Sequence, residues 1–183
     1  MVGRRTTAAV AALAGVVLVV SGCGTETKGK PEPSTDTSAA GALWDPCTQV
    51  SDAVLKQIGV DPGSKKSGVA GVEEPGWKVC SWHDPEHPFN YDLGIWATIR
   101  TVDEIKKKQD NIDFTPVTVG GRAGFTFRSA SYDDDEVCDL VFPTAQGGSV
   151  QVSSFNISTK SRQVPPCNRT LAAAEILAPI LPG

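Results

Sequence analysis

The feature that most constrains the fold of this chain is a set of four cysteines at wide intervals: Cys47, Cys80, Cys138 and Cys167. The fifth cysteine, Cys23, follows an apolar leader and is set apart from the others. In an exported protein, an even set of cysteines is typical of a disulfide framework. Four cysteines allow three pairings. We prefer Cys47–Cys80 with Cys138–Cys167, because each bond would then tie the end of a helix to a strand.

The leader indicates export and anchoring. Arg4 and Arg5 are followed by residues 6–20, an almost uninterrupted run of Ala, Val and Leu. This is typical of a secretory signal, since a transmembrane helix needs about 20 apolar residues. The run ends in Val20-Ser21-Gly22-Cys23, which resembles the lipobox of bacterial lipoproteins. The resemblance implies that residues 1–22 are cleaved off and that Cys23 carries a diacylglycerol, anchoring the protein to the outer face of the cell membrane. The alternatives are an ordinary signal peptide with a chance cysteine and a cytosolic chain with an apolar start.

Composition fits one acidic domain on a polar linker. The chain has 183 residues and a net charge of −4, which becomes −6 when Arg4 and Arg5 leave with the leader. An acidic protein is a poor partner for nucleic acid. Residues 23–42 hold the lipidated cysteine and a Thr-, Ser-, Lys- and Pro-rich stretch that cannot bury enough apolar surface to fold. Residues 43–183 remain, enough for one domain with a core.

The residue pattern predicts an α+β fold. Apolar spacing predicts a helix over 48–58 that ends at Gly59, a loop over 59–76, and strands over 77–82 and 91–100. A capping box at Thr101 and Glu104 opens a second helix, which runs to about residue 110. Gly pairs at 120–121 and 147–148 predict two hairpins, over 114–127 and 137–155. A last helix, 169–178, is predicted with Asn168 as its cap. We expect an antiparallel sheet of about six strands flanked by three short helices.

Two runs could carry chemistry. His83 and His87 lie four apart, but Pro85 and Pro88 prevent a regular helix that would aim both at one metal ion. The acidic run 133–136 lacks the alternate spacing of a calcium loop. There is no C-x-x-C or Gly-x-Ser-x-Gly motif and no spare thiol once the disulfides form. We therefore expect no metal, no cofactor and no catalytic residue.

Several short motifs follow one another in a fixed order: Trp44-Asp45-Pro46-Cys47, Cys80-Ser81-Trp82, Val119-Gly120-Gly121-Arg122-Ala123, Cys138 in a strand, and Pro166-Cys167 at the start of the last helix. In this order they resemble one family, the actinobacterial lipoproteins of domain of unknown function 3558 (DUF3558). The resemblance covers residues 43–182. It implies an envelope lipoprotein with two disulfides and brings no catalytic residue. The layout is more distantly similar to the extracellular sensor domain of mycobacterial Ser/Thr kinases and to PsbP-like folds.

These observations favour a non-catalytic binding or sensing module on the outer face of the membrane, whose partner is an envelope protein, a lipid or a glycan. The alternatives are a structural or assembly lipoprotein and a hydrolase. A binding module predicts an apolar pocket or an uncovered sheet face, lined by Trp77, Trp82 or Trp96. The opposing interpretation, which we prefer, places these tryptophans in the core or against the disulfides.

Overall fold

A computed structural model describes residues 43–183. The predicted leader (1–22), the linker (23–42) and the anchor Cys23 lie outside the described residues. Seven strands form one antiparallel sheet in the order β1-β2-β3-β7-β6-β5-β4. The strands are β1 (Lys66–Ser67), β2 (Trp77–His83), β3 (Tyr91–Thr98), β4 (Asn111–Val119), β5 (Arg122–Ser129), β6 (Val137–Pro143) and β7 (Ser149–Asn156).

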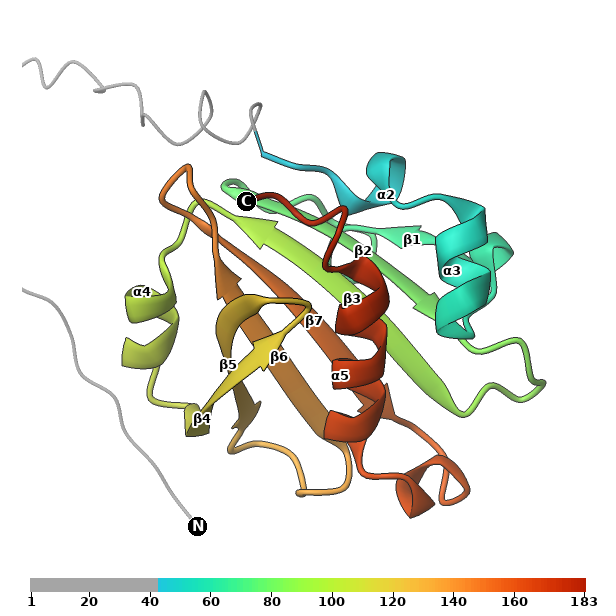
Figure 1. The fold of residues 1–183 in the computed structure, drawn as a ribbon. Helices are drawn as coiled ribbons and strands as arrows, with labels where there is room; N and C mark the ends of the chain where they lie inside the picture. Colours follow the sequence, from blue (N-terminus) through green and yellow to red (C-terminus); the bar gives the residue numbers. More distant parts are fainter. Residues whose placement is uncertain (1–42) are drawn as a thin grey trace, which may run out of the picture. The chain divides into compact units, whose positions relative to one another are not determined.

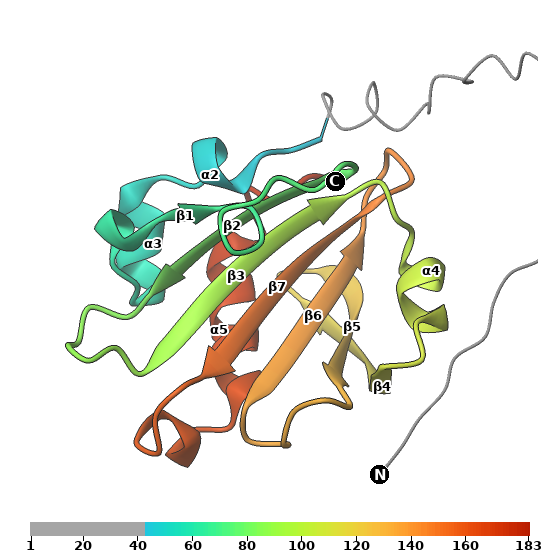
Figure 2. The ribbon, with the colours of Figure 1, turned by 180° about the vertical axis from the view of Figure 1, so that it is seen from behind.

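Four α-helices flank the sheet unevenly. They are α2 (Pro46–Gln49), α3 (Asp52–Ile58), α4 (Val102–Lys107) and α5 (Pro166–Leu177), with 3-10 turns η1 (Pro62–Ser64) and η2 (Ser161–Gln163). Figure 1 shows α2, α3 and α5 on one face of the sheet. Figure 2 shows the other face, where α4 lies at one side and β2, β3 and β7 are not covered by a helix. We call this second face the open face.

The α+β class is confirmed, with two corrections to the element count. The sheet has seven strands instead of about six, because β1 pairs Lys66 and Ser67 with Ser81 and Cys80 inside the predicted loop. A two-residue strand has no periodicity that a sequence could reveal. The predicted helix over 48–58 is two helices, since Val50 between them is extended (φ −91°, ψ 116°), so residues 43–183 contain four α-helices instead of three.

Helix ends follow local chemistry in most places. The Ser51 hydroxyl accepts a hydrogen bond from the Val54 amide, which starts α3, and Gly59 ends that helix with φ +100°. The capping box of Thr101 and Glu104 is present at α4. The prediction of Asn168 as the cap of the last helix is wrong, because α5 already begins at Pro166. Proline suits this first position, where its missing N–H is not needed.

The main core lies between the sheet and helices α2, α3 and α5. It contains Trp82, Leu93, Ile95, Leu140 and Phe142, among others, with Ala173, Ala174 and Leu177 of α5 packed on them. A smaller cluster lies on the open face, where Ile105 of α4 packs on Phe127 and Val141. On β6 the two clusters alternate, with Leu140 and Phe142 in the main core and Val141 in the smaller cluster, because alternate side chains point to opposite faces.

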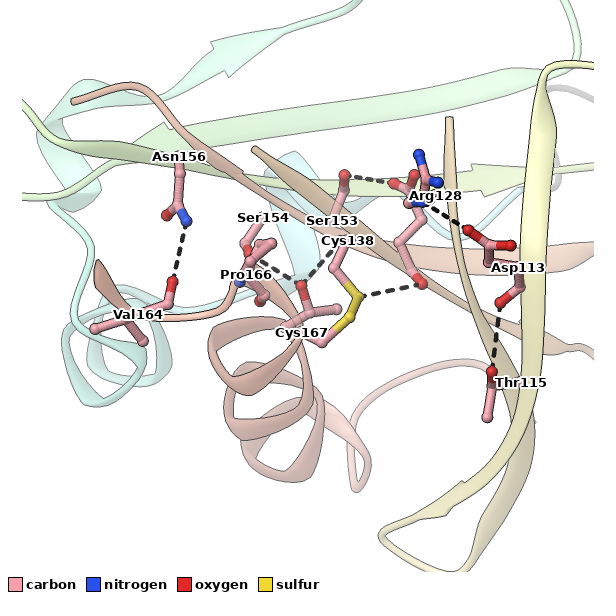
Figure 3. The surroundings of a disulfide bond; sticks show 12 residues. Asp113, Thr115, Arg128, Cys138, Ser153, Ser154, Asn156, Val164, Pro166 and Cys167 are labelled. Carbon is pink, nitrogen blue, oxygen red and sulfur yellow. Dashed lines mark hydrogen bonds and ion pairs between the residues drawn. A yellow bond between two sulfur atoms is a disulfide. The ribbon is translucent and has the colours of Figure 1, made fainter. Parts of the chain in front are cut away.

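Both disulfides have the preferred pairing. Cys47 at α2 is bonded to Cys80 of β2, and Cys138 of β6 is bonded to Cys167 in the first turn of α5. Figure 3 shows the second bond beside Ser154 and Pro166. The Ser154 hydroxyl donates to the Pro166 carbonyl at 2.8 Å, and the Thr170 hydroxyl donates to the Cys138 carbonyl at 2.9 Å. The start of α5 is thus fixed to β6 and β7 by one covalent bond and two buried hydrogen bonds.

Candidate ligand groove on the open face

A groove of about 870 Å³ runs over the open face. Its lining comes from all the strands except β1, from helix α4 with the segments on either side of it, and from the loop between β5 and β6. The residues are Trp77, Trp96, Arg100, Glu104, Ile105, Lys108, Asp110, Asn111, Phe127, Ser129, Ser131, Tyr132, Val137, Asp139, Gln151, Ser153 and Phe155. Aromatic rings with a few convergent polar groups are typical of small-molecule sites.

Strand pairing explains how these residues meet. Ser153 of β7 pairs with Gly94 of β3 on one side and with Asp139 of β6 on the other, so the three form one row across the sheet. Two residues before Ser153 in β7, Gln151 lies beside Trp96 in the next row. In the row on the other side of Ser153, Phe155 lies beside Val137. Rows on the same face are about 7 Å apart, so the row of Ser153 runs between two aromatic side chains.

Asp139 is the buried charge of this groove. Only 7% of the surface of Asp139 is exposed to solvent. The Gln151 amide donates to Asp139 Oδ1 at 2.9 Å and the Ser153 hydroxyl donates to the same oxygen at 2.5 Å. Within residues 43–183, Oδ2 has no hydrogen-bond partner. Burial raises the pKa of the Asp139 carboxyl, although both hydrogen bonds and the charge of Lys108 act to lower it.

Two pairs of aromatic rings border the row. Trp77 and Trp96 lie edge to face, with centroids 6.2 Å apart and planes at 88°. Phe155 and Tyr132 form a similar pair at 5.1 Å and 76°. The indole of Trp96 leans over Gly94, since a methyl group on Gly94 would lie 2.7 Å from its nitrogen. A side chain at position 94 would therefore push the ring away from the sheet.

Helix α4 closes one side of the groove. Ile105 packs on Phe127, and the Asn111 amide donates to the Ile105 carbonyl at 3.0 Å. Arg100 and Glu104 form an exposed ion pair at 3.4 Å on this side. Lys108, after the last turn of α4, is close enough to affect the charge of Asp139 but does not form an ion pair with it.

The three tryptophans singled out in the sequence divide between the two interpretations. Trp82 is 1% exposed and lies in the main core, as the preferred interpretation expects. Trp77 and Trp96 are half-buried and line the groove. The strand alternation decides this, because Trp82 and Trp77 are an odd number of residues apart on β2 and point to opposite faces.

The two runs considered for chemistry lie outside this groove. The His83 ring stacks on Phe89, with ring centroids 4.6 Å apart, and lies 6.4 Å from the His87 ring. The acidic run 133–136 pairs with two arginines: Asp134 with Arg128 at 3.1 Å, and Asp133, Asp135 and Glu136 with Arg162. Across residues 43–183, no three side chains of His, Cys, Asp or Glu are grouped as a metal site.

Sequence reasoning missed Asp139, although a signal was present. The residue interrupts an otherwise apolar strand, Val137-Cys138-Asp139-Leu140-Val141-Phe142, in which all side chains are buried. A charged residue is rarely fully buried unless it is paired. An aspartate in the middle of such a run is therefore a candidate for function.

The comparison with protein families decides the identity of the chain. The model of the family described as protein of unknown function (DUF3558) matches residues 18–179. The chain is a member of the DUF3558 family. No curated protein sequence and no solved structure matches this DUF3558 protein. None of the helices within residues 43–183 of the DUF3558 protein combines the length and the hydrophobicity that a membrane span requires.

Proposed function

We propose that this protein is a lipoprotein of the cell envelope, anchored through Cys23 on the outer face of the membrane, whose domain binds a ligand in the groove of the open face. The leader and lipobox-like stretch support the anchor, and the family match begins at residue 18, so that it includes Cys23. The disulfides support an oxidising compartment. The observation that carries the binding role is the buried carboxylate of Asp139 in the groove.

A buried carboxylate lowers the stability of a fold unless its charge is compensated. The hydrogen bonds of Asp139 all reach one oxygen, and both come from neutral groups. No packing requirement explains the carboxylate, because its strand neighbours on the open face, Val137 and Val141, are apolar. Perturbed titratable groups in a groove are candidates for function. The second oxygen is the group that a ligand would use.

Neither of the two alternative functions, a structural or assembly role and a hydrolase, fits the groove as well. A structural or assembly role needs a flat adhesive surface and gives no reason for a buried acid in a groove lined by aromatic rings. A hydrolase needs a nucleophile with a base beside it. In the groove, the base beside the Ser153 hydroxyl is the carboxylate of Asp139, a weaker base than imidazole, and neither His83 nor His87 lines the groove. We therefore propose a binding role without catalysis, directed at a small molecule, a lipid or a glycan of the envelope and not at nucleic acid.

The test uses the mature lipoprotein purified from the membrane of the producing bacterium in a mild detergent. Native mass spectrometry, followed by extraction and mass analysis, should detect a small molecule that leaves with the protein. Ser153→Trp places an indole in the row of Gly94, Ser153 and Asp139, the central row of the groove, and should abolish this co-purification. Val72→Trp changes a residue that is 65% exposed and does not line the groove, and it should retain the molecule. Equal retention by both variants, with folding checked by circular dichroism, would contradict the proposal.

A further inference from the structure

We infer that the groove binds an organic cation, with an ammonium group at the Asp139 carboxylate and its alkyl part against the Trp96 ring. The inference rests on the proposed binding role and names the chemical class of the ligand.

The charges in the groove are complementary to a cation. Three acidic residues, Glu104, Asp110 and Asp139, and two basic ones, Arg100 and Lys108, line it. Arg100 and Glu104 pair with each other at 3.4 Å. Lys108 is exposed and makes no ion pair with a described residue. The one buried charge is therefore the carboxylate of Asp139, which a small cation can approach through the unpartnered Oδ2.

One more acid belongs to the open face. Asp92 of β3 pairs with Phe155 in the row beside that of Asp139, and with His83 on its other side. Burial raises the pKa of Asp92, while the charges of His83 and Lys66 act to lower it. Asp92 thus lies directly beside Phe155, and Asp139 lies diagonal to Phe155 on the next strand, so two acidic residues flank this part of the open face.

The aromatic rings favour alkylated cations over small inorganic ions as the ligand of the groove. Aromatic faces attract ammonium groups electrostatically, tryptophan most strongly, and they also cover the alkyl substituents. Trp77 and Trp96, at right angles, form two adjoining walls on one side of the central row, and Phe155 and Tyr132 form a similar corner on the other. A metal ion would gain nothing from these rings and would need several oxygen ligands.

Small probes can test the charge preference directly. The full mature protein in a maltoside detergent is titrated at pH 7.5 with choline and, separately, with 3,3-dimethylbutan-1-ol, its uncharged isostere. The readout is the indole N–H resonance of Trp96, assigned by its loss in Trp96→Phe. We expect choline to shift this resonance at concentrations at least tenfold lower than the alcohol.

Matched variants separate charge from shape. Asp139→Asn keeps the size of the side chain and should reduce choline binding at least tenfold while leaving the alcohol unchanged. Asp52→Asn removes an exposed carboxylate of α3, which lies on the opposite face, and should have no effect. Gly94→Ala moves the Trp96 ring and should weaken both probes.

The outcomes distinguish this inference from the proposed function. Equal binding of choline and the alcohol at Trp96 would still identify the groove as a ligand site, but it would contradict the inference that the ligand is a cation. The same holds if neither probe binds but the co-purified molecule is lost in Ser153→Trp. If neither probe binds and no molecule co-purifies, both the inference and the proposed function are wrong.

Discussion

Cys138 and Asp139 are neighbours on β6, and their side chains lie on opposite faces of the sheet. The Cys138 sulfur is bonded to Cys167 of α5, while the Asp139 carboxylate lines the groove. The disulfide therefore holds the strand that carries the buried carboxylate. On β7, the neighbours Ser154 and Ser153 likewise point to opposite faces of the sheet. The Ser154 hydroxyl donates towards α5 and the Ser153 hydroxyl donates to Asp139. On the face covered by α5, a disulfide and a hydrogen bond thus fix the two strands whose other face carries Asp139 and Ser153 in the groove.

The pKa of Asp139 gives a prediction about stability and pH. Because burial raises the pKa in the folded state above that of the unfolded chain, the ionised carboxylate opposes folding. This penalty is absent below the ordinary aspartate pKa of about 4 and complete above the raised value. Asp139→Asn, which removes the charge, should raise the melting temperature at pH 7 by roughly 3–5 °C for each kcal/mol relieved, with no gain at pH 3.

Thermal unfolding of both proteins across pH 3 to 8, monitored by circular dichroism, measures this difference. Asp134→Asn is the control, since that side chain is 85% exposed and should show no such rise between pH 3 and 7. A melting temperature of Asp139→Asn below that of the wild type at pH 7 would show that the carboxylate stabilises the fold.

The two disulfides should contribute similar stability. They join residues 33 and 29 positions apart. A cross-link over this length lowers the conformational entropy of the unfolded chain, which stabilises the folded state by roughly 3.5 kcal/mol. The double variants Cys47→Ala/Cys80→Ala and Cys138→Ala/Cys167→Ala should each lose about 3 kcal/mol of unfolding free energy. Urea denaturation measures this loss, and non-reducing peptide mass mapping of the wild type checks the pairing. Crossed pairs in that map would refute it.

The turn between β4 and β5 offers a matched pair of glycine substitutions. Gly120 and Gly121 both have positive φ, +56° and +78°. A methyl group on Gly120 would lie 2.2 Å from the Cβ of Ala178 after α5, whereas one on Gly121 would meet nothing. Gly121→Ala should therefore cost about 1 kcal/mol of backbone strain, and Gly120→Ala about 2–4 kcal/mol because the hairpin must also leave α5.

Urea denaturation of the two alanine variants compares these costs under the same conditions. The Gly120 amide also donates to Glu175 at 3.1 Å, so loss of the contact with α5 should be visible as faster amide exchange at that position. Equal losses from the two substitutions would mean that the turn does not depend on its contact with α5.

The local pattern of the chain predicts most of the elements and little of their arrangement. The hairpins at Gly120-Gly121 and Gly147-Gly148 and the capping box at Thr101 are confirmed, because each depends on a few adjacent residues. The break at Val50 and the start of α5 at Pro166 were missed, since helical spacing does not locate interruptions or ends well. The two residues of β1 are strand only through their pairing with β2.

The groove could not be predicted because its rows join distant strands. The sheet places β3 beside β7, so that Trp96 meets Gln151 and Gly94 meets Ser153, more than fifty residues away. No local periodicity specifies that pairing. What the sequence does contain is Asp139 within an apolar strand, and Trp77 and Trp82 at an odd spacing on β2, which indicates that the two tryptophans point to opposite faces of the sheet.

The anchor gives the last prediction, which concerns residues outside the described part of the chain. Only a thiol can form the thioether that joins Cys23 to diacylglycerol, and its stable membrane attachment depends on more than one acyl chain. Cys23→Ser should therefore abolish labelling by radioactive palmitate and release the protein from the membrane or leave its leader uncleaved. Labelling and cell fractionation measure these effects, with Ser21→Ala as a control that keeps a small residue before the thiol and should still be labelled. Labelling that persists in Cys23→Ser, or a wild-type protein recovered from the cytosol with reduced cysteines, would exclude the proposed anchor and the exported location that depends on it.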